Sequence, residues 1–206
     1  MIKSKAKNQA VIENHQRYLQ RLNLYKEAGY DIEAERRFIL ARARPIKGDI
    51  LEIGTGKGHL SLLLARELKR FISIDISEED QKLAALNLSY YGLGDRVDLR
   101  LMNAAELEFE DESFELVISA NTLHHLHEPY MVLNEIIRVL REGGRMVISD
   151  FNETGLALIS RMHKKEGRSH EPGGIDMPKA MAYLLSKSFR VERFSSKLQD
   201  LLIAYK

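Results

Sequence analysis

Short β-rich runs alternate with helical stretches through the middle of this chain, and this alternation constrains its fold more than any other feature. The β-rich runs are strongly apolar, as at 50–53 and 116–120. Parallel strands buried on both faces have this composition, and a helix must carry the chain from each strand to the next. The pattern predicts strands at 50–53, 70–75, 97–102, 116–120 and 145–151, with helices at about 58–69, 78–90 and 129–141.

The end of the chain departs from this rhythm. Two further β-rich runs, 188–195 and 201–205, are separated only by residues 196–200. Because that turn is too short for a crossover between parallel strands, the two runs should form an antiparallel hairpin. We therefore expect a three-layer α/β sandwich, whose mostly parallel, seven-stranded sheet has one antiparallel strand from this C-terminal hairpin.

Two segments lie outside the alternation. Residues 1–44 are predicted to form a helical cap with ten basic and five acidic residues, a net charge of +5. The core follows at 45–206 and contains a long connection at 152–175, which we interpret as a lid or substrate loop. The middle of this connection is basic. That fits either a clamp for an anionic acceptor or an exposed amphipathic helix that packs inward through Leu156, Ile159 and Met162.

Composition excludes several classes of protein. The chain has no cysteine, which rules out disulfides, thiolate metal sites and a cysteine nucleophile. A net charge of +1 gives no general attraction to nucleic acid, which stays open as a partner without being favoured. No apolar run approaches the ~18 residues of a membrane span, and no apolar signal core follows the basic start. We therefore expect a cytoplasmic protein, of an oligomeric state that the sequence does not indicate.

A glycine-rich turn, Gly54-Thr55-Gly56-Lys57-Gly58, joins the first strand to the next helix. Glycines let a backbone approach a ligand closely. A phosphate-binding loop needs a glycine where Leu51 stands, and a dinucleotide fingerprint needs one where His59 stands, so the spacing excludes both. Glu52 precedes the turn and would repel a pyrophosphate, but it suits a cationic ligand. S-adenosylmethionine carries a sulfonium and an α-ammonium group. Glu52 can pair with the ammonium side, directly or through water, while backbone N–H groups of the turn face the carboxylate.

The second predicted strand supports the same ligand. It ends in Asp75, about 20 residues past the turn, where a carboxylate can accept hydrogen bonds from both ribose hydroxyls. Ser77 is better explained as the N-cap of the following helix. The site therefore extends from the glycine turn along an adenosyl group.

Together these residues resemble the class I S-adenosylmethionine-dependent methyltransferases, nearest the small-molecule branch that includes the ubiquinone and menaquinone C-methyltransferases. The resemblance covers about residues 45–206. Residues 103–109 resemble the Asp-Ala-x-x-Leu-Pro-Phe segment that lines the adenine, and 138–145 resemble the Arg-x-Leu-Lys-Pro-Gly-Gly turn before strand five. Residues 113–119 and 122–126 match the fourth strand and its carboxyl end.

The resemblance implies a Rossmann-like fold and in-line methyl transfer from S-adenosyl-L-methionine to a small-molecule acceptor, with S-adenosyl-L-homocysteine as product. Asn103 stands where an aspartate is expected to accept from the adenine amino group. Its amide oxygen can still accept, without charge assistance. With the turn and the second strand, the resemblance assigns these residues to the cofactor: Glu52, Gly54, Thr55, Gly56, Gly58, Asp75, Ile76, Asn103, Ala104, Ala105 and Asn121.

His124 and His125 are the candidate catalytic residues, since imidazole titrates near neutral pH and can act as a general base. The alternative is that they only line the methionine moiety or pack the loop. His127 is expected outside the site, because Pro129 begins the following helix. A metal site is not expected, since consecutive histidines cannot easily converge on one ion.

Three other functions compete with a small-molecule methyltransferase. The first is an RNA or protein methyltransferase, in which the basic cap and the basic connection form one continuous stripe. This chain lacks the Asn-Pro-Pro-Tyr motif of enzymes that methylate planar nitrogens, because Ser119-Ala120-Asn121-Thr122 stands there. The second is a protein that binds S-adenosylmethionine without catalysis. The third, a nicotinamide-dependent oxidoreductase, is disfavoured by His59.

Overall fold

The computed structural model describes residues 2–165, 167 and 173–206. Its centre is a seven-stranded sheet of order β3-β2-β1-β4-β5-β7-β6. Strands β1 to β5 are parallel, and β7 runs antiparallel to both β5 and β6. The predicted fold, including the C-terminal hairpin, is therefore confirmed. The strands are β1 (Ile50–Ile53), β2 (Phe71–Asp75), β3 (Val97–Leu101), β4 (Phe114–Ala120), β5 (Leu140–Phe151), β6 (Arg190–Ser195) and β7 (Gln199–Tyr205).

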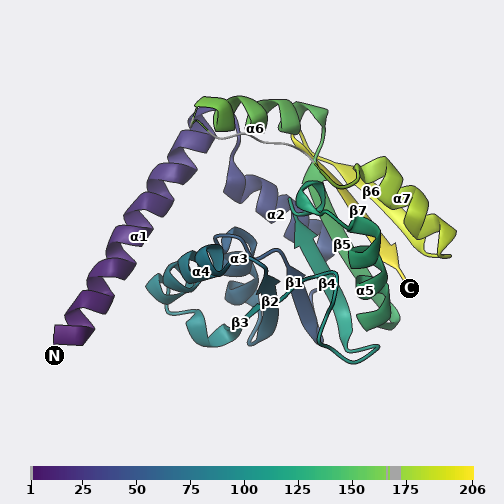
Figure 1. Ribbon diagram of the computed structural model, residues 1–206, viewed down its shortest axis with the longest axis horizontal. Helices are drawn as coiled ribbons and strands as arrows, with labels where there is room; N and C mark the ends of the chain where they lie inside the picture. Colours follow the sequence, from purple (N-terminus) through teal and green to yellow (C-terminus); the bar gives the residue numbers. More distant parts are fainter. Residues whose placement is uncertain (1, 166, 168–172) are drawn as a thin grey trace.

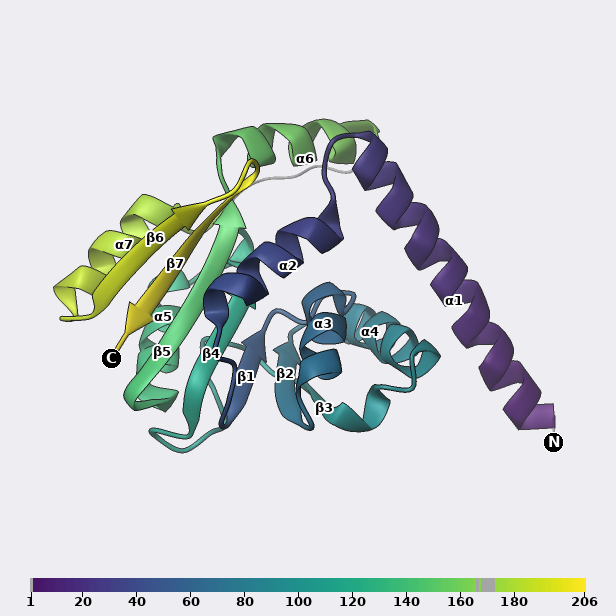
Figure 2. The same cartoon turned by 180° about the vertical axis from the view of Figure 1, so that it is seen from behind.

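Helices cover both faces of the sheet (Figures 1 and 2). On one face, residues of α2 (Ile32–Ala43), α3 (His59–Glu67) and α4 (Glu78–Tyr90) pack against Ile50 and Ile118. On the other face, α5 (Pro129–Val139) and α7 (Met177–Ser186) pack against Leu51 and Val117. Successive residues of one strand thus enter opposite core clusters, as the alternation of side chains along a strand requires. This explains why the central strands are apolar throughout.

The connection at 152–175 contains a helix, α6 (Glu153–Lys165). Its Ile159 and Met162 are buried and its Leu156 packs beside them, so the amphipathic-helix interpretation of this segment is confirmed. They meet Tyr25 and Tyr30 of the N-terminal region in a third cluster. Residues 166 and 168–172, with the basic Arg168 and His170, lie outside the described residues.

A long helix, α1 (Ile2–Glu27), precedes α2 and extends beyond the sheet in both views (Figures 1 and 2). It lies against α4, where the Asn14 amide donates to Asn87 Oδ1 over 2.8 Å and the His15 ring stacks on Tyr90 at 3.5 Å. Asn87 in turn donates to the Lys57 carbonyl in the glycine turn over 2.9 Å. None of the helices in the described part of the chain combines the length and the apolar character that a bilayer span requires.

Candidate functional site

The glycine turn between β1 and α3 has a separate structural reason for each of its glycines. Gly54, Gly56 and Gly58 all have positive φ, at 84°, 49° and 78°, a region that side chains disfavour. A Cβ on Gly54 would lie 2.1 Å from Thr122 Oγ1, and one on Gly58 would lie 3.1 Å from the Ala84 Cβ of α4. A Cβ on Gly56 would meet only open space. The turn therefore packs closely on both sides and opens at Gly56.

A cavity of about 450 Å³ lies beside this opening, at the carboxyl ends of β1, β2 and β4. Ligands of open parallel sheets bind at this edge. The cavity brings together most of the predicted cofactor residues: Gly54, Thr55, Gly56, Asp75, Ile76, Asn103, Ala104, Ala105 and Asn121. Glu52 and Gly58 do not line it.

Glu52 lies beneath the turn and does not line the cavity, so its pairing with an ammonium group, directly or through water, stays a prediction. Its Oε2 accepts from Ser61 Oγ over 2.5 Å and from Ser73 Oγ over 2.7 Å. Its Oε1 is buried and has no hydrogen-bond partner among the described residues. Burial raises the pKa of this carboxyl to about 7. Thr55, which does line the cavity, is joined to Glu52 through Ser73 Oγ, 2.7 Å from Thr55 Oγ1.

The N–H groups of the turn are also used differently from the prediction. Those of Gly54 and Thr55 both donate to the Ile74 carbonyl, over 2.9 and 3.0 Å. The Gly56 N–H donates to Asp75 Oδ2 over 2.7 Å, and the Gly58 N–H to the Thr55 carbonyl over 2.9 Å. These four N–H groups are therefore already engaged within the protein. Two cationic side chains that can pair with a ligand carboxylate also line the cavity, Lys57 and Arg36.

Arg36 was not among the predicted site residues. It comes from α2, outside the glycine motif, and is only 7% exposed. Its Nη1 lies 3.5 Å from Tyr30 Oη, at the limit of a hydrogen bond. The signal for it in the sequence was only the basic character of residues 1–44, which does not single out one arginine.

Asp75 occupies the predicted place at the end of β2. Its Oδ2 accepts from the Gly56 N–H over 2.7 Å and its Oδ1 from the Ser77 N–H over 2.9 Å. Each oxygen keeps a second lone pair for a ligand hydroxyl. Ser77 is the N-cap of α4 as predicted, because its hydroxyl accepts from the Asp80 N–H over 3.2 Å.

The far end of the cavity is formed by Ile76, the loop after β3 and the start of α5. Ile76 is apolar and yet 73% exposed, so it offers an uncovered surface for a flat ring. Asn103 Oδ1 already accepts from the Ala105 N–H over 3.0 Å, which leaves it one lone pair. His127 also lines the cavity, so its predicted place outside the site is wrong. His127 lies between the short helical turn Leu123–His125 and the start of α5 at Pro129.

His124 and His125 lie on that short helical turn, and His124 forms a buried pair with Asp150. The His124 Nδ1 lies 2.5 Å from Asp150 Oδ1, and its backbone N–H donates to Asp150 Oδ2 over 2.8 Å. A carboxylate beside Nδ1 favours the imidazole tautomer that carries its proton on Nδ1. In this tautomer the basic lone pair is on Nε2. Asp150 was not among the predicted site residues, although its position near the end of an apolar strand was an available signal.

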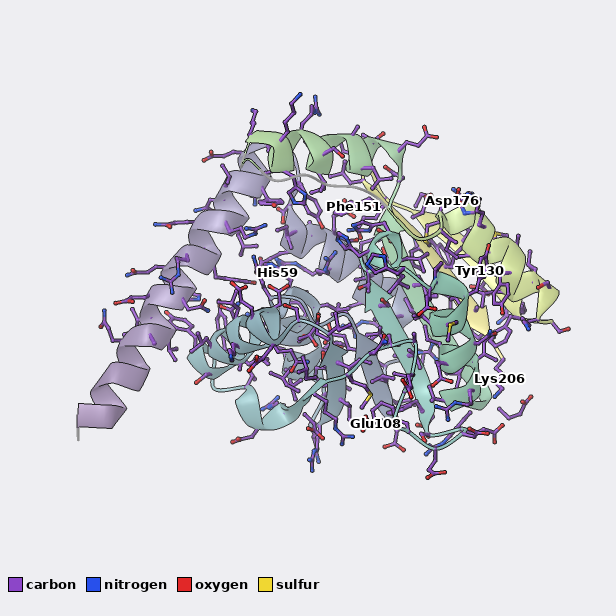
Figure 3. All side chains as sticks on the ribbon, viewed as in Figure 1. His59, Glu108, Tyr130, Phe151, Asp176 and Lys206 are labelled. Carbon is purple, nitrogen blue, oxygen red and sulfur yellow. The ribbon has the colours of Figure 1, made fainter. Side chains whose placement is uncertain are left out.

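A second cavity of about 400 Å³ adjoins the first. Six residues line both: Arg36, Lys57, His59, Asp80, Asn121 and His125. His124 and Phe151 line only the second of these two, beneath residues of α1, α2 and α6. Figure 3 labels His59 at the start of α3 and Phe151 at the end of β5. The candidate site therefore has two connected chambers, with Asn121 and His125 at their junction.

Comparison with known proteins agrees with this geometry. Residues 51–148 match the family described as a methyltransferase domain. This part of the chain is therefore similar to the class I S-adenosylmethionine-dependent methyltransferases. It is 37% identical over 116 residues to phosphatidylethanolamine N-methyltransferase of Cereibacter sphaeroides, which covers 56% of this chain and 57% of that protein. It is 33% identical over 118 residues to demethylmenaquinone methyltransferase of Clavibacter sepedonicus, covering 57% and 47%.

These matches have clear limits. The chain spans about half the length of the curated relatives it matches. Among solved structures, the cyclase SpnF has a TM-score of 0.68 at 16% identity, covering 84% of this chain and 81% of its own. That likeness shows the fold alone, and a cyclase on this fold illustrates that a fold does not settle a reaction.

Proposed function

We propose that this methyltransferase binds S-adenosyl-L-methionine in the first cavity and passes its methyl group to a small-molecule acceptor in the second. The observation that carries the proposal is the meeting of the two cavities at Asn121 and His125. Residues of α1, α2 and α6 line the second cavity, and its volume of about 400 Å³ lies in the range of small-molecule pockets. Residues 1–44 act as a cap over it.

The residues of the first cavity fit the parts of the cofactor. The apolar face of Ile76 and the loop of Asn103, Ala104 and Ala105 take the adenine, and Asp75 accepts from the ribose. Arg36 and Lys57 hold the α-carboxylate, replacing the turn N–H groups that are already used. Bound cofactor supplies a methyl group on a sulfonium.

His124 is the proposed general base for an acceptor hydroxyl. Bound S-adenosyl-L-methionine would supply the methyl group and leave as S-adenosyl-L-homocysteine, and His124 Nε2 would take the proton that the acceptor hydroxyl loses. Asp150 is a positioning residue, because it holds the imidazole in the required tautomer and balances the imidazolium that forms. His125 lines both cavities and excludes water at the junction.

The test is methyl transfer from radiolabelled donor to separate metabolite, RNA and protein pools. We expect label in the metabolite pool, lost in His124→Ala. In Asp150→Asn we expect a fall in kcat with little change in KM and a displaced pH profile, whereas the surface variant Asp95→Asn keeps wild-type values. Label in RNA or protein would overturn the acceptor class. Intact cofactor affinity with no transfer to any pool would show a binding protein without methyltransferase activity. On sequence grounds alone we also place its action in the cytoplasm.

A further inference from the structure

Three positive side chains converge on the second cavity from separate parts of the chain. Arg21 comes from α1, Arg36 from α2 and Lys57 from the glycine turn, and all three line it. They surround His59, whose pKa falls to about 3 through burial of the ring and then through the charges of Arg36, Arg21 and Lys57. Asp80 is the one carboxylate among the described residues that line this cavity. Its walls are therefore net positive.

The two arginines take their contacts from tyrosines and not from carboxylates. Arg21 Nη2 donates to Tyr25 Oη over 2.7 Å, and its guanidinium lies 4.9 Å from the centre of the same ring. Arg36 reaches Tyr30 Oη. Within the described part of the chain, neither arginine forms an ion pair with a carboxylate. Partly desolvated cations are stabilised by a matching anion.

The bound cofactor meets this need only in part. Its carboxylate can pair with Arg36, at the boundary of the two cavities. It also carries an ammonium and a sulfonium into the same region, so the local charge becomes more positive. Arg21 lines the second cavity but not the first, which leaves its guanidinium to the acceptor.

One side of the second cavity is formed by aromatic and aliphatic side chains. Tyr30 lies edge-on to Phe151, with ring centres 5.4 Å apart, and 6.0 Å from Tyr25. Ile32 and Ile159 complete this side. Such a wall favours a flat apolar body by area burial and by edge-to-face contact with its ring. An acceptor with both an anionic end and an aromatic body satisfies the two halves of the cavity.

We propose that the acceptor is a small hydroxy-aromatic carboxylate. Its carboxylate pairs with Arg21, its ring packs against Tyr30 and Phe151, and its hydroxyl faces His124. This inference rests on the function proposed above and narrows the acceptor to one chemical class. Arg21 is then a specificity-determining residue contributed by α1.

The test uses two probes that differ in one charge, 3,4-dihydroxybenzoate and its methyl ester. Each is titrated by calorimetry into the protein saturated with S-adenosyl-L-homocysteine, so that binding is read without methyl transfer. A charge-assisted pair is worth about tenfold to a hundredfold in affinity. We expect the acid to bind tighter than the ester by that factor. Arg21→Gln brings the ratio of the two dissociation constants close to one, and Arg21→Lys keeps part of the preference.

Arg17→Gln is the matched control, because Arg17 is an exposed arginine of the same helix. It should keep the wild-type ratio. Equal binding of acid and ester overturns the proposal, as does an equal loss of both in Arg21→Gln, which would assign Arg21 to packing. Binding of neither probe also overturns it. In that case, transfer to another metabolite leaves the proposed function standing, and absence of transfer to any pool removes the proposed function as well.

Discussion

Asp75 lines the first cavity and accepts hydrogen bonds from two backbone N–H groups, those of Gly56 and Ser77. An asparagine there keeps the size of the side chain and loses its charge. Because a hydrogen bond to a charged partner contributes about 1.5–3 kcal/mol, we expect Asp75→Asn to weaken S-adenosylmethionine binding about 10- to 150-fold. Titration calorimetry measures this, with Asp95→Asn as a control of wild-type affinity. An affinity close to that of the wild type would contradict the proposed role of Asp75 in binding the ribose.

Glu52 gives the fold a pH dependence of its own. Burial raises its pKa from 4.5 to about 7, so in that range the folded chain binds more protons than the unfolded chain. The free energy of unfolding therefore falls as pH rises from 4.5 to 7. Glu52→Gln has no carboxyl group to titrate at this position. Its free energy of unfolding relative to that of the wild type should therefore increase by up to about 3 kcal/mol as the pH rises through this range. Urea unfolding at both ends of the range measures the difference, and a constant difference would contradict it.

At the scale of elements, Tyr30 joins the turn after α1 to the ends of β4 and β7. Its hydroxyl oxygen accepts from Asn121 Nδ2 over 2.9 Å and from the fully buried Gln199 Nε2 over 3.2 Å. Tyr30→Phe removes this acceptor from the part-buried Asn121 amide and leaves Gln199 Nε2 with Asn121 Oδ1 alone among the described residues, so we expect a loss of about 1–3 kcal/mol in the free energy of unfolding. Tyr90→Phe, at a side chain 43% exposed, is the control. Equal stability of the two variants would argue against this link.

Arg138 connects α5 to the loop that follows β3. Its guanidinium donates to the Phe109 carbonyl over 2.7 Å and to the Leu107 carbonyl over 2.8 Å, and it pairs with Glu135. The same loop carries Asn103, so its order matters for the adenine end of the cavity. We expect Arg138→Lys, which cannot make the same fork of bonds, to speed amide exchange at residues 103–109 and to weaken cofactor binding. Unchanged exchange in this loop would show that α5 does not hold it.

For the whole molecule, the fold could be predicted because its signals are local. Apolar runs such as 50–53 indicate buried strands, and the short turn at 196–200 indicates that the last two strands are antiparallel. Neither signal depends on contacts with distant residues. Helix α7 was not predicted, although Asp176 caps it in the usual way, because its segment was not separated from the hairpin that follows. The burial of helix α6 could not be inferred locally, because Ile159 packs in a cluster with distant residues, among them Tyr25 and Leu198.

The sequence could predict those site residues that lie at one edge of the sheet. Asp75 and Asn121 both follow strands, and the carboxyl ends of parallel strands meet. Pairs far apart in the chain could not be inferred from spacing. The contact of His124 with Asp150 depends on the register of β4 and β5, and the place of Arg36 depends on how α2 packs. The side of the turn on which Glu52 lies was equally undecided, because Ser61 and Ser73 had to be brought beneath it.

Ligand binding should stabilise the whole molecule, because both cavities join residues 1–44 to the sheet through Arg36 and Asn121. A ligand at a hundred times its dissociation constant adds about 2.7 kcal/mol to the free energy of unfolding. For a chain of 206 residues that corresponds to a rise of roughly 5–11 °C in Tm. We expect this rise with S-adenosyl-L-homocysteine, a smaller one in Asp75→Asn at the same concentration, and none with NADH. A rise with NADH alone would point to nicotinamide chemistry and contradict the proposed cofactor. Two observations disfavour that outcome: the glycine spacing does not fit a dinucleotide fingerprint, and the N–H groups of the turn that bond within the protein leave few donors for a pyrophosphate.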